Sequence, residues 1–217
     1  MKIIDLFLDL LYPPRCLLCR KVLKYGTGEI CGKCADKLPK LRTDECRRDL
    51  ANISLCVFPF RYRDEIRESL HRFKFQGAAA YGPIYADFIL KSIDENQISC
   101  DIISWVPIHK KRYRERGYDQ SEIIAQALGE KLGIPCKRLL VKVKHNKRQS
   151  SLDDREARRK NVIGAYRCIA DDDINGKCIL LVDDIVTSGS TLKECAKMLK
   201  ASGCSEIYAA AVAAVSS

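Results

Sequence analysis

Residues 178–194 read Cys-Ile-Leu-Leu-Val-Asp-Asp-Ile-Val-Thr-Ser-Gly-Ser-Thr-Leu-Lys-Glu, and this stretch decides the fold. Its apolar run from Ile179 to Val182 shows no alternation, which is typical of a strand buried on both faces of a parallel sheet. Two adjacent carboxylates, Asp183 and Asp184, come next, followed by a short hydroxyl-rich turn that opens a helix. Ligands of open α/β sheets bind at the carboxyl ends of the strands, and a helix N-terminus attracts anions. The stretch therefore predicts a phosphate held by the turn and a sugar diol held by the two aspartates.

The same stretch resembles the signature with which type I phosphoribosyltransferases bind 5-phosphoribosyl 1-pyrophosphate (PRPP): four hydrophobic residues, two acidic residues and Thr-x-Gly-x-Thr. The resemblance implies that Asp183 and Asp184 bind the ribose 2′- and 3′-hydroxyls and orient the ribose in any catalysis. It also implies that the 5′-phosphate is bound by the turn, which consists of Thr187, Ser188, Gly189, Ser190 and Thr191. The alternative is an ordinary strand, loop and capped helix. A Walker A nucleotide site is excluded, because the turn contains no Gly-Lys-Ser/Thr.

Four cysteines near the N-terminus are spaced as metal ligands. Cys16-Leu-Leu-Cys19 is followed by Cys31-Gly-Lys-Cys34, and two Cys-x-x-Cys knuckles can place four thiolates tetrahedrally around one Zn²⁺. Such a structural zinc would fold a segment that is too short to build its own core. The alternatives are two unrelated pairs or a redox dithiol. The remaining cysteines are scattered singly and fit small buried hydrophobes, except that Cys46, in a polar segment, stays unassigned.

At 217 residues, 47% of them hydrophobic, the chain has room for one α/β domain and a small appendage. Strand-like and helix-like segments alternate, which predicts a doubly wound parallel sheet with right-handed crossovers, of the type I phosphoribosyltransferase kind. We expect an N-terminal helix and four-cysteine zinc module in residues 1–50 and the phosphoribosyltransferase-like domain in residues 51–217. The expected strands are 54–62, 101–106, 136–143, 179–182 and 207–215, and the expected helices are 63–73, 81–93, 120–132, 153–159 and 190–202.

The N-terminal stretch 3–11 is predicted to be a short amphipathic helix and not a signal peptide, because Asp5 and Asp9 interrupt it and no small-residue cleavage site follows. Pro13 and Pro14 end this helix. The longest apolar runs of the chain are far too short for a membrane span. We therefore expect a cytoplasmic protein without membrane insertion.

The formal net charge of +10 favours a polyanionic partner, and the distribution of the charge matters more than its sum. Basic residues crowd into 110–116 and 142–160, both in expected loops beside the predicted ligand site. The first loop brings His109 and Arg116 to a strand end, where the pyrophosphate of PRPP needs positive charge. The second loop, with Lys147 and Arg148, is a candidate lid over the leaving group. The alternative is that both loops are solvated surface. Tyr113 either stacks on a base or packs its loop against the sheet. For Tyr118, which precedes a helix, packing is favoured.

Several motifs together resemble the ComF family of competence proteins over nearly the whole chain. They are the double knuckle, Val-Pro-Ile-His at 106–109, Arg-x-Arg-Gly-Tyr-Asp-Gln at 114–120, Arg-Gln-x-x-Leu at 148–152, Arg-x-x-Asn-Val-x-Gly-Ala-Tyr at 158–166, and the PRPP signature. That family joins a zinc finger to a phosphoribosyltransferase-like domain and is implicated in natural transformation. Two departures stand out: Asp49 stands where a partner for Cys46 would complete a third cysteine pair, and Asp119 stands where Asn is usual.

The resemblance implies that the chain binds PRPP with Mg²⁺, contains structural Zn²⁺ and handles imported single-stranded DNA in the cytoplasm, with DNA-uptake or recombination proteins as partners. A second hypothesis is an active phosphoribosyltransferase that transfers ribose 5-phosphate from PRPP to a base or amine and releases pyrophosphate. Nothing in the sequence identifies the acceptor. A third hypothesis is a transcription regulator that senses PRPP, although the sequence has no helix-turn-helix pattern.

Overall fold

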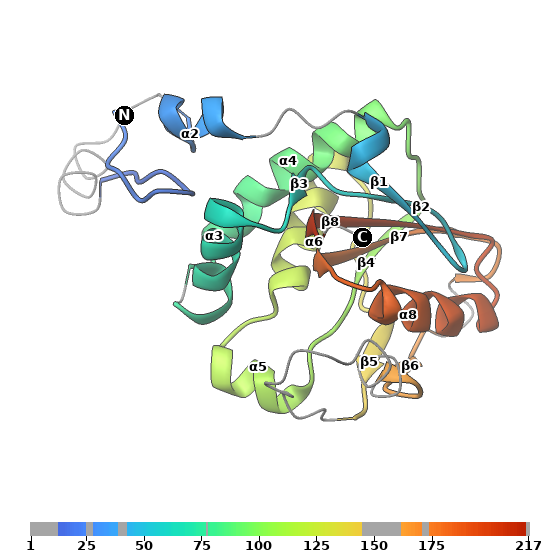
Figure 1. Ribbon diagram of the computed structural model, residues 1–217. Coiled ribbons are helices and arrows are strands. Elements are labelled where there is room, and N and C mark those ends of the chain that lie inside the picture. Colours follow the sequence, from blue (N-terminus) through green and yellow to red (C-terminus); the bar gives the residue numbers. More distant parts are fainter. Residues whose placement is uncertain are drawn as a thin grey trace.

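The computed structural model describes residues 13–24, 28–38, 43–76, 78–144, 162–170 and 174–215, and the ribbon in Figure 1 shows their arrangement. The described chain contains a six-stranded sheet with the order β1-β2-β8-β7-β4, in which β3 also pairs with β8. Its strands are β1 (Arg47–Leu50), β2 (Ile53–Val57), β3 (Phe60–Arg61), β4 (Ile102–Trp105), β7 (Cys178–Val186) and β8 (Glu206–Ala214). A separate antiparallel pair consists of β5 (Leu140–Lys142) and β6 (Tyr166–Cys168).

Helices cover both faces of the sheet. One face packs against α3 (Asp64–Phe75), α4 (Tyr81–Glu95) and α6 (Gln120–Leu132), and the other packs against α8 (Ser190–Ala201) together with β5 and β6 (Figure 1). Alternate residues of β7 serve the two cores, since Leu180 and Val182 face the first and Ile179 and Leu181 face the second. The other described helices are α2 (Gly32–Lys37), the 3-10 helix η1 (Thr43–Cys46) and α5 (Lys110–Arg116).

The central strand β7 is apolar from Ile179 until it reaches its two aspartates, and it is buried on both faces. Ile179 to Val182 are fully buried, and the neighbouring strand β8 contributes a run of buried alanines and valine from Ala209 to Ala214. β7 and β8 run parallel to their ends at Val186 and Ala214, and β4 runs parallel to the first half of β7. The doubly wound α/β fold that the sequence predicts is confirmed.

Several local predictions differ from the structure. The strand expected over 54–62 is divided into β2 and β3, and β2 lies inside the sheet because β1, which we did not expect, pairs with it at the edge. β1 ends at the expected boundary, residue 50, and is part of the main sheet. The strand expected over 136–143 is reduced to β5, which pairs with the unexpected strand β6. The helices expected over 3–11 and 153–159 lie outside the described residues.

The segment after β4 is a helix, α5, where the sequence analysis expected a loop. Arg, Lys and Glu all have good helix propensity, so a highly charged run can be helical when both of its ends are capped. At the first end, the side chain of His109 accepts a hydrogen bond from the Lys111 N–H. At the other end, Gly117 adopts the left-handed conformation with φ of 84°. Helix caps therefore outweigh charge density in this segment.

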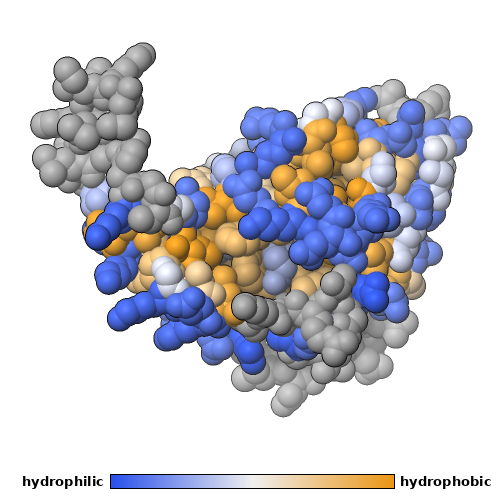
Figure 2. All heavy atoms as spheres, turned by 90° about the horizontal axis from the view of Figure 1, so that it is seen from above, coloured by the Kyte–Doolittle hydropathy of each residue, from blue (hydrophilic) through white to orange (hydrophobic). Residues whose placement is uncertain are grey.

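None of the helices in the described part of the chain has the length and apolar character needed to cross a bilayer. The space-filling view in Figure 2 shows hydrophilic side chains over much of one face, with apolar residues gathered in patches between them.

The turn between β7 and α8 is held from one side by β1. Gly189 has φ of 72°, and a Cβ atom at this position would lie 2.5 Å from Cδ2 of the buried Leu50. From the same strand, Arg48 Nη1 donates a hydrogen bond of 2.6 Å to the carbonyl oxygen of Thr187. The edge strand thus closes over the turn, and a side chain at position 189 would both strain the backbone and displace Leu50.

We expect Gly189→Ala to lower the free energy of unfolding by more than Gly176→Ala. Gly176 also has a positive φ, of 68°, but an added Cβ there would meet no described atom within 4 Å. Both variants incur the left-handed backbone penalty of roughly 1–2 kcal/mol, and only Gly189→Ala adds a steric clash with Leu50. Urea denaturation of both variants, alone and combined with Leu50→Ala, measures the excess. Equal costs, or an excess that persists in the Leu50→Ala background, would contradict the contact.

Candidate functional site

The two carboxylates of the signature lie where β4 leaves the side of β7. The last contact between these strands is the hydrogen bond from the Val106 N–H to the carbonyl oxygen of Val182. β7 itself continues along β8 to Val186, so that Asp183 and Asp184 lie within the strand and not after it. From β4 the chain passes to α6 on one face of the sheet, and from β7 it passes to α8 on the other. Such a topological switch point is where open α/β sheets bind ligands.

Asp183 is a half-buried acid held by donors on its own strand and on α6. Its Oδ1 accepts hydrogen bonds from the Asp184 N–H at 2.8 Å and from Ser121 Oγ at 3.2 Å. Burial and the adjacent Asp184 carboxylate raise the pKa of Asp183 to about 7, although these hydrogen bonds and the nearby Lys74 oppose the rise. The side chain is therefore poised to gain or lose a proton near neutral pH.

Asp184 forms an ion pair with Lys74, the next-to-last residue of α3, at 2.7 Å between Oδ2 and Nζ. The side chains are only 14% and 23% exposed, so water screens their attraction less than it screens a surface pair. The sequence analysis did not identify Lys74. No motif links it to Asp184, and the only signal was a basic residue near the end of an amphipathic helix.

Arg116, the last residue of α5, is the second cation near Asp184. Its guanidinium carbon lies 5.0 Å from the ring centroid of Phe75, and its Nη1 donates to Gln120 Oε1. Burial lowers the pKa of Arg116, and the charge of Asp184 opposes this effect. The predicted ligand residue His109 is the half-buried N-cap of α5, where Nδ1 accepts from the Lys111 N–H at 3.2 Å. Lys147 and Arg148 lie outside the described residues.

The hydroxyl-rich turn leads directly into α8. Gly189 is its N-cap and has no side chain to cap the helix, and the Ser190 N–H donates a long hydrogen bond of 3.4 Å to Ser188 Oγ. Ser188 Oγ and Ser190 Oγ lie 2.9 Å apart and hydrogen-bond to each other, while Thr187 is exposed and Thr191 is half-buried. The uncapped N–H groups and the positive end of the helix dipole are the groups that a phosphate requires.

Asp119 has a structural role that the sequence analysis did not assign. Its buried carboxylate caps α6 through the Ser121 N–H at 3.1 Å, and its Oδ2 accepts from the Ile108 N–H at 2.8 Å. Burial raises the pKa of Asp119 to about 6. An Asp directly before a helix is an N-cap signal that could have identified it. The same segment packs through Tyr118, whose ring lies 6.0 Å from that of Phe73 and whose hydroxyl donates to the Phe73 carbonyl oxygen. The preferred interpretation of Tyr118 as a packing residue is confirmed.

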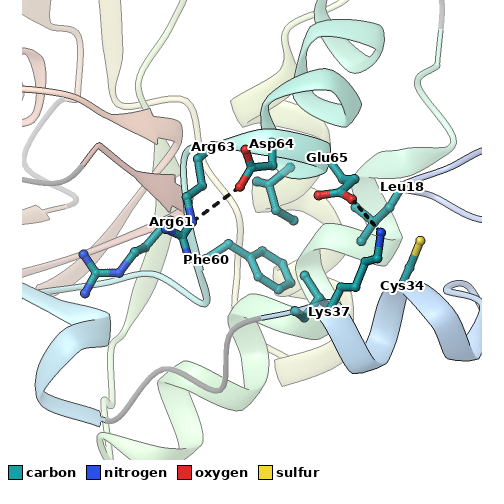
Figure 3. Close-up of a pocket in the computed structure, with 10 residues that line it drawn as sticks. Leu18, Cys34, Lys37, Phe60, Arg61, Arg63, Asp64 and Glu65 are labelled. Carbon is teal, nitrogen blue, oxygen red and sulfur yellow. Dashed lines mark ion pairs between the residues drawn. The ribbon is translucent and has the colours of Figure 1, made fainter.

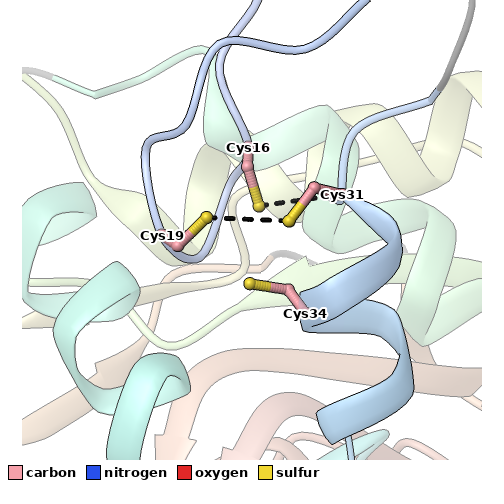
Figure 4. Close-up of side chains that lie close together, drawn as sticks. All are labelled: Cys16, Cys19, Cys31 and Cys34. Atoms are coloured by element: carbon pink, nitrogen blue, oxygen red, sulfur yellow. Dashed lines mark hydrogen bonds between the residues drawn. The ribbon is translucent and has the colours of Figure 1, made fainter.

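The four N-terminal cysteines converge on one point, as Figure 4 shows. Their sulfur atoms, which belong to Cys16, Cys19, Cys31 and Cys34, all lie within 4.8 Å of one another. A tetrahedral zinc with Zn–S bonds of about 2.3 Å would place its sulfurs about 3.8 Å apart, and Cys19 Sγ and Cys31 Sγ are separated by 3.7 Å. All cysteines of the chain are free thiols, so no disulfide competes with a metal for these sulfurs. The interpretation as two unrelated pairs is therefore wrong.

The surroundings of the cluster favour the thiolate form of Cys16 over that of Cys34. Burial tends to raise the pKa of Cys16, but hydrogen bonds from backbone N–H groups, chiefly that of Cys31, lower it to about 7. Burial and the neighbouring thiols raise the pKa of Cys34. Cys16 therefore loses its proton at a lower pH than Cys34. A divalent cation would stabilise all four thiolates together, and this donor set fits zinc.

The first knuckle is anchored on α3. The carbonyl oxygen of Leu17 accepts hydrogen bonds of 2.8 Å from Ser69 Oγ and from Arg72 Nη2, and Arg72 Nη2 also donates to the carbonyl oxygen of Leu18 at 2.6 Å. Both leucines are buried in the main core. The cysteine module therefore packs on the same helix that carries Lys74 to the acid pair.

Figure 3 shows a small cavity at the seam between the cysteine module and the start of α3. Leu18 and Phe60 line it, and an ion pair of 3.9 Å between Lys37 and Glu65 spans it. Its volume of about 50 Å³ is far below the ~300–1,000 Å³ of a ligand site, so we interpret it as a packing seam.

An open parallel sheet with an acid pair at its switch point, a hydroxyl-rich turn and an N-terminal four-cysteine cluster defines a phosphoribosyltransferase-type protein with a zinc ribbon. Family comparison agrees, because residues 7–53 match the double zinc ribbon domain and residues 118–217 match the phosphoribosyl transferase domain. The chain is a homologue of the competence proteins F and ComFC, in agreement with the resemblance to the ComF family.

The similarity to these relatives extends over most of each chain. Competence protein F of Haemophilus influenzae is 28% identical over 88% of this chain and 86% of its own length. Competence protein ComFC of Bacillus subtilis is 29% identical over 87% and 78%. The DNA utilization protein YhgH of Escherichia coli K12 is 24% identical over 90% and 94%. Among solved structures, a purine phosphoribosyltransferase from Pyrococcus horikoshii is 21% identical over 61% of this chain and 72% of its own, with a TM-score of 0.38.

We expect Cys31→Ser to release the metal of the cluster and to lower the free energy of unfolding by several kcal/mol, because metal binding and folding of such a module are one process. Zinc content of the purified protein and its urea denaturation curve measure the two effects. Cys168→Ser, in a half-buried cysteine outside the cluster, is the control and should keep the full metal content. Unchanged zinc in Cys31→Ser would refute the site.

The raised pKa of Asp183 predicts a stability that depends on pH. The folded protein keeps this proton up to pH about 7, whereas the unfolded chain loses it near pH 4, so that stability falls as the pH rises through this window. Relative to Asp183→Asn, the wild type should lose roughly 1 kcal/mol of unfolding free energy per pH unit. Denaturation curves between pH 4 and 8 measure the difference, with the exposed Asp94→Asn as control. Parallel curves for wild type and Asp183→Asn would contradict the assignment.

Proposed function

We propose that this protein binds PRPP together with Mg²⁺ at the acid pair and the α8 turn, and acts in natural transformation by handling imported single-stranded DNA in the cytoplasm. The observation that carries the proposal is the combination of an acid pair at the switch point, an uncapped helix N-terminus beside it, and two cations next to Asp184.

The parts of PRPP have complementary groups in this arrangement. The ribose hydroxyls donate to the carboxylates of Asp183 and Asp184, while the 5′-phosphate accepts from the N–H groups of residues 187–191. Lys74 and Arg116 supply positive charge for the pyrophosphate, with His109, Lys147 and Arg148 as further candidates. Mg²⁺ would neutralise the charge of the pyrophosphate. When the ribose diol binds the Asp184 carboxylate, the ion pair between Asp184 and Lys74 has to open, or both groups share the carboxylate. The ammonium group of Lys74 is then available to the pyrophosphate.

The proposed role in DNA handling rests on composition and on the names of the relatives. Two of these are called competence proteins and one a DNA utilization protein. The net charge of +10 suits a polyanion, and α5 presents five basic residues in a single short helix. The zinc that we propose for the four cysteines would act structurally, by holding the module that anchors α3.

Active transfer to a base or amine is the second candidate, and Lys142 favours it. Its Nζ donates to Tyr166 Oη at 2.9 Å, and its pKa is lowered by burial and by the charge of Arg112 while Asp183 opposes the change. This half-buried amine of β5, which interacts electrostatically with Asp183, is a candidate group for orienting an acceptor. Release of pyrophosphate from PRPP in the presence of candidate acceptors measures this activity.

The PRPP site is tested by calorimetric titration with PRPP and Mg²⁺. We expect Asp184→Asn and Thr187→Ala to bind at least tenfold more weakly than the wild type, because each removes a group that contacts the ligand. Asp87→Asn is a matched control, since the Asp87–Lys131 ion pair has the same length of 2.7 Å but lies on α4 and α6 away from the switch point. Equal affinities in Asp184→Asn and Asp87→Asn would refute the site.

The DNA-handling part of the proposal is tested by a separate titration with a fluorescent single-stranded oligonucleotide over a range of salt concentrations. Binding should weaken steeply with salt, with a logarithmic slope of about −0.7 for each phosphate contacted. Absence of binding at low salt would remove the DNA part of the proposal and leave the PRPP part standing.

A further inference from the structure

A second cavity lies where α5 meets the start of α6. Its volume is about 210 Å³. It is lined by Trp105, Ile108, Lys110, Tyr113, Arg114, Asp119, Glu122 and Arg138. None of these lining residues hydrogen-bonds or forms an ion pair with Asp183 or Asp184 among the contacts of the described chain. None of these side chains is among the ligands that we propose for PRPP.

The size of the cavity restricts its occupant. Sites for whole drug-sized molecules measure ~300–1,000 Å³, so a space of about 210 Å³ suits one heterocyclic ring with its attached chain outside. The walls suit such a ring, because the buried Trp105 and the half-buried Ile108 are apolar, and Tyr113 lies at the rim with 47% of its surface exposed. An exposed tyrosine beside an apolar hollow provides a stacking surface for a base.

The acidic part of the lining points to an amino-bearing ring. Asp119 and Glu122 belong to the N-cap and first turn of α6. The oxygens of Asp119 each accept from a backbone N–H, which leaves Glu122 as the more available acceptor. Burial raises the pKa of Glu122 while the charge of Arg138 opposes the change. In nucleic-acid recognition, carboxylates accept hydrogen bonds from the N4 amino group of cytosine. Thymine offers no such exocyclic donor.

The basic part of the lining suits a phosphate backbone. Lys110 and Arg114 are exposed on one turn of α5, and the exposed Arg138 approaches the cavity from the segment before β5. Within the described residues, none of these three forms an ion pair within 4 Å. Exposed cations around an aromatic hollow combine backbone attraction with base stacking, as single-strand binding requires.

We propose that this cavity receives one amino-bearing base of single-stranded DNA, with cytosine preferred, while the flanking phosphates contact Lys110, Arg114 and Arg138. The inference rests on the proposed role in DNA handling and gives that role a location. Tyr113 stacks on the base, Glu122 accepts from its amino group, and the apolar walls exclude water from the ring.

Fluorescence anisotropy with oligo(dC) and oligo(dT) of equal length tests this inference. Tyr113→Ala should weaken binding of oligo(dC) roughly fivefold or more, while Tyr113→Phe, which keeps the ring, should bind like the wild type. Glu122→Ala should abolish the preference for oligo(dC) over oligo(dT). Glu130→Ala is its control, because Glu130 is an exposed acid on the same helix outside the cavity. The preference is the ratio of the affinities for oligo(dC) and oligo(dT). Removing one negative charge changes both affinities alike, so this effect cancels in the ratio.

The outcomes separate this inference from the proposed function. If the wild type binds neither oligonucleotide, this inference and the DNA part of the proposed function both fail, and the PRPP part stands. If the wild type binds but Tyr113→Ala and Glu122→Ala behave like it, the cavity is not the base site and only this inference is overturned. Competition with free dCMP is a further measurement. If dCMP displaces oligo(dC) at concentrations comparable to that of the oligonucleotide, the cavity binds a mononucleotide and not a strand, which overturns the inference. Unchanged binding of PRPP with Mg²⁺ by Tyr113→Ala shows that the variant is folded.

Discussion

Two carboxylates next to each other on a buried strand are the constraint on which the rest of the structure depends. The pleat of β7 sends successive side chains to opposite faces, so the two acids need separate partners. Asp184 lies on the face of α3 and α6, where Lys74 pairs with it at 2.7 Å. Asp183 accepts hydrogen bonds from the Asp184 N–H and from Ser121 of α6, and its pKa is raised to about 7. Helices that are remote in sequence are thereby fixed around one edge of the sheet.

The cations that compensate the acids also have to be held in place, and aromatic packing does this. Phe75 lies under the Arg116 guanidinium, and Phe73 packs against Tyr118 and Tyr85. The hydroxyl of Tyr85 in turn lies 2.6 Å from Ser69 Oγ, which bonds to the first cysteine knuckle. A continuous set of contacts along α3 therefore connects the N-terminal module with the switch point.

Features encoded in consecutive residues were predictable from the sequence. The buried strand, the acid pair, the turn and the two knuckles each show their chemistry at fixed short spacing, and the structure has β7, its turn and the cysteine cluster where these patterns lie. Lys74 was not predictable, because only tertiary packing brings α3 to Asp184. Nor was the contact between Leu50 and Gly189, which depends on an edge strand without an apolar pattern. In α5, charge suggested a loop, whereas capping by His109 and Gly117 produces a helix.

The position of α3 has a thermodynamic consequence. One face of this helix binds the knuckle through Ser69 and Arg72, and its last turn carries Lys74 to the acid pair. Two ligands that each favour one orientation of a shared rigid helix are linked, and such coupling is reciprocal. If metal binding changes the affinity for a ligand at Asp184 by some factor, binding of that ligand changes the affinity for the metal by the same factor. The chelator concentration that removes the metal at equilibrium then reports occupancy at the other end of the helix.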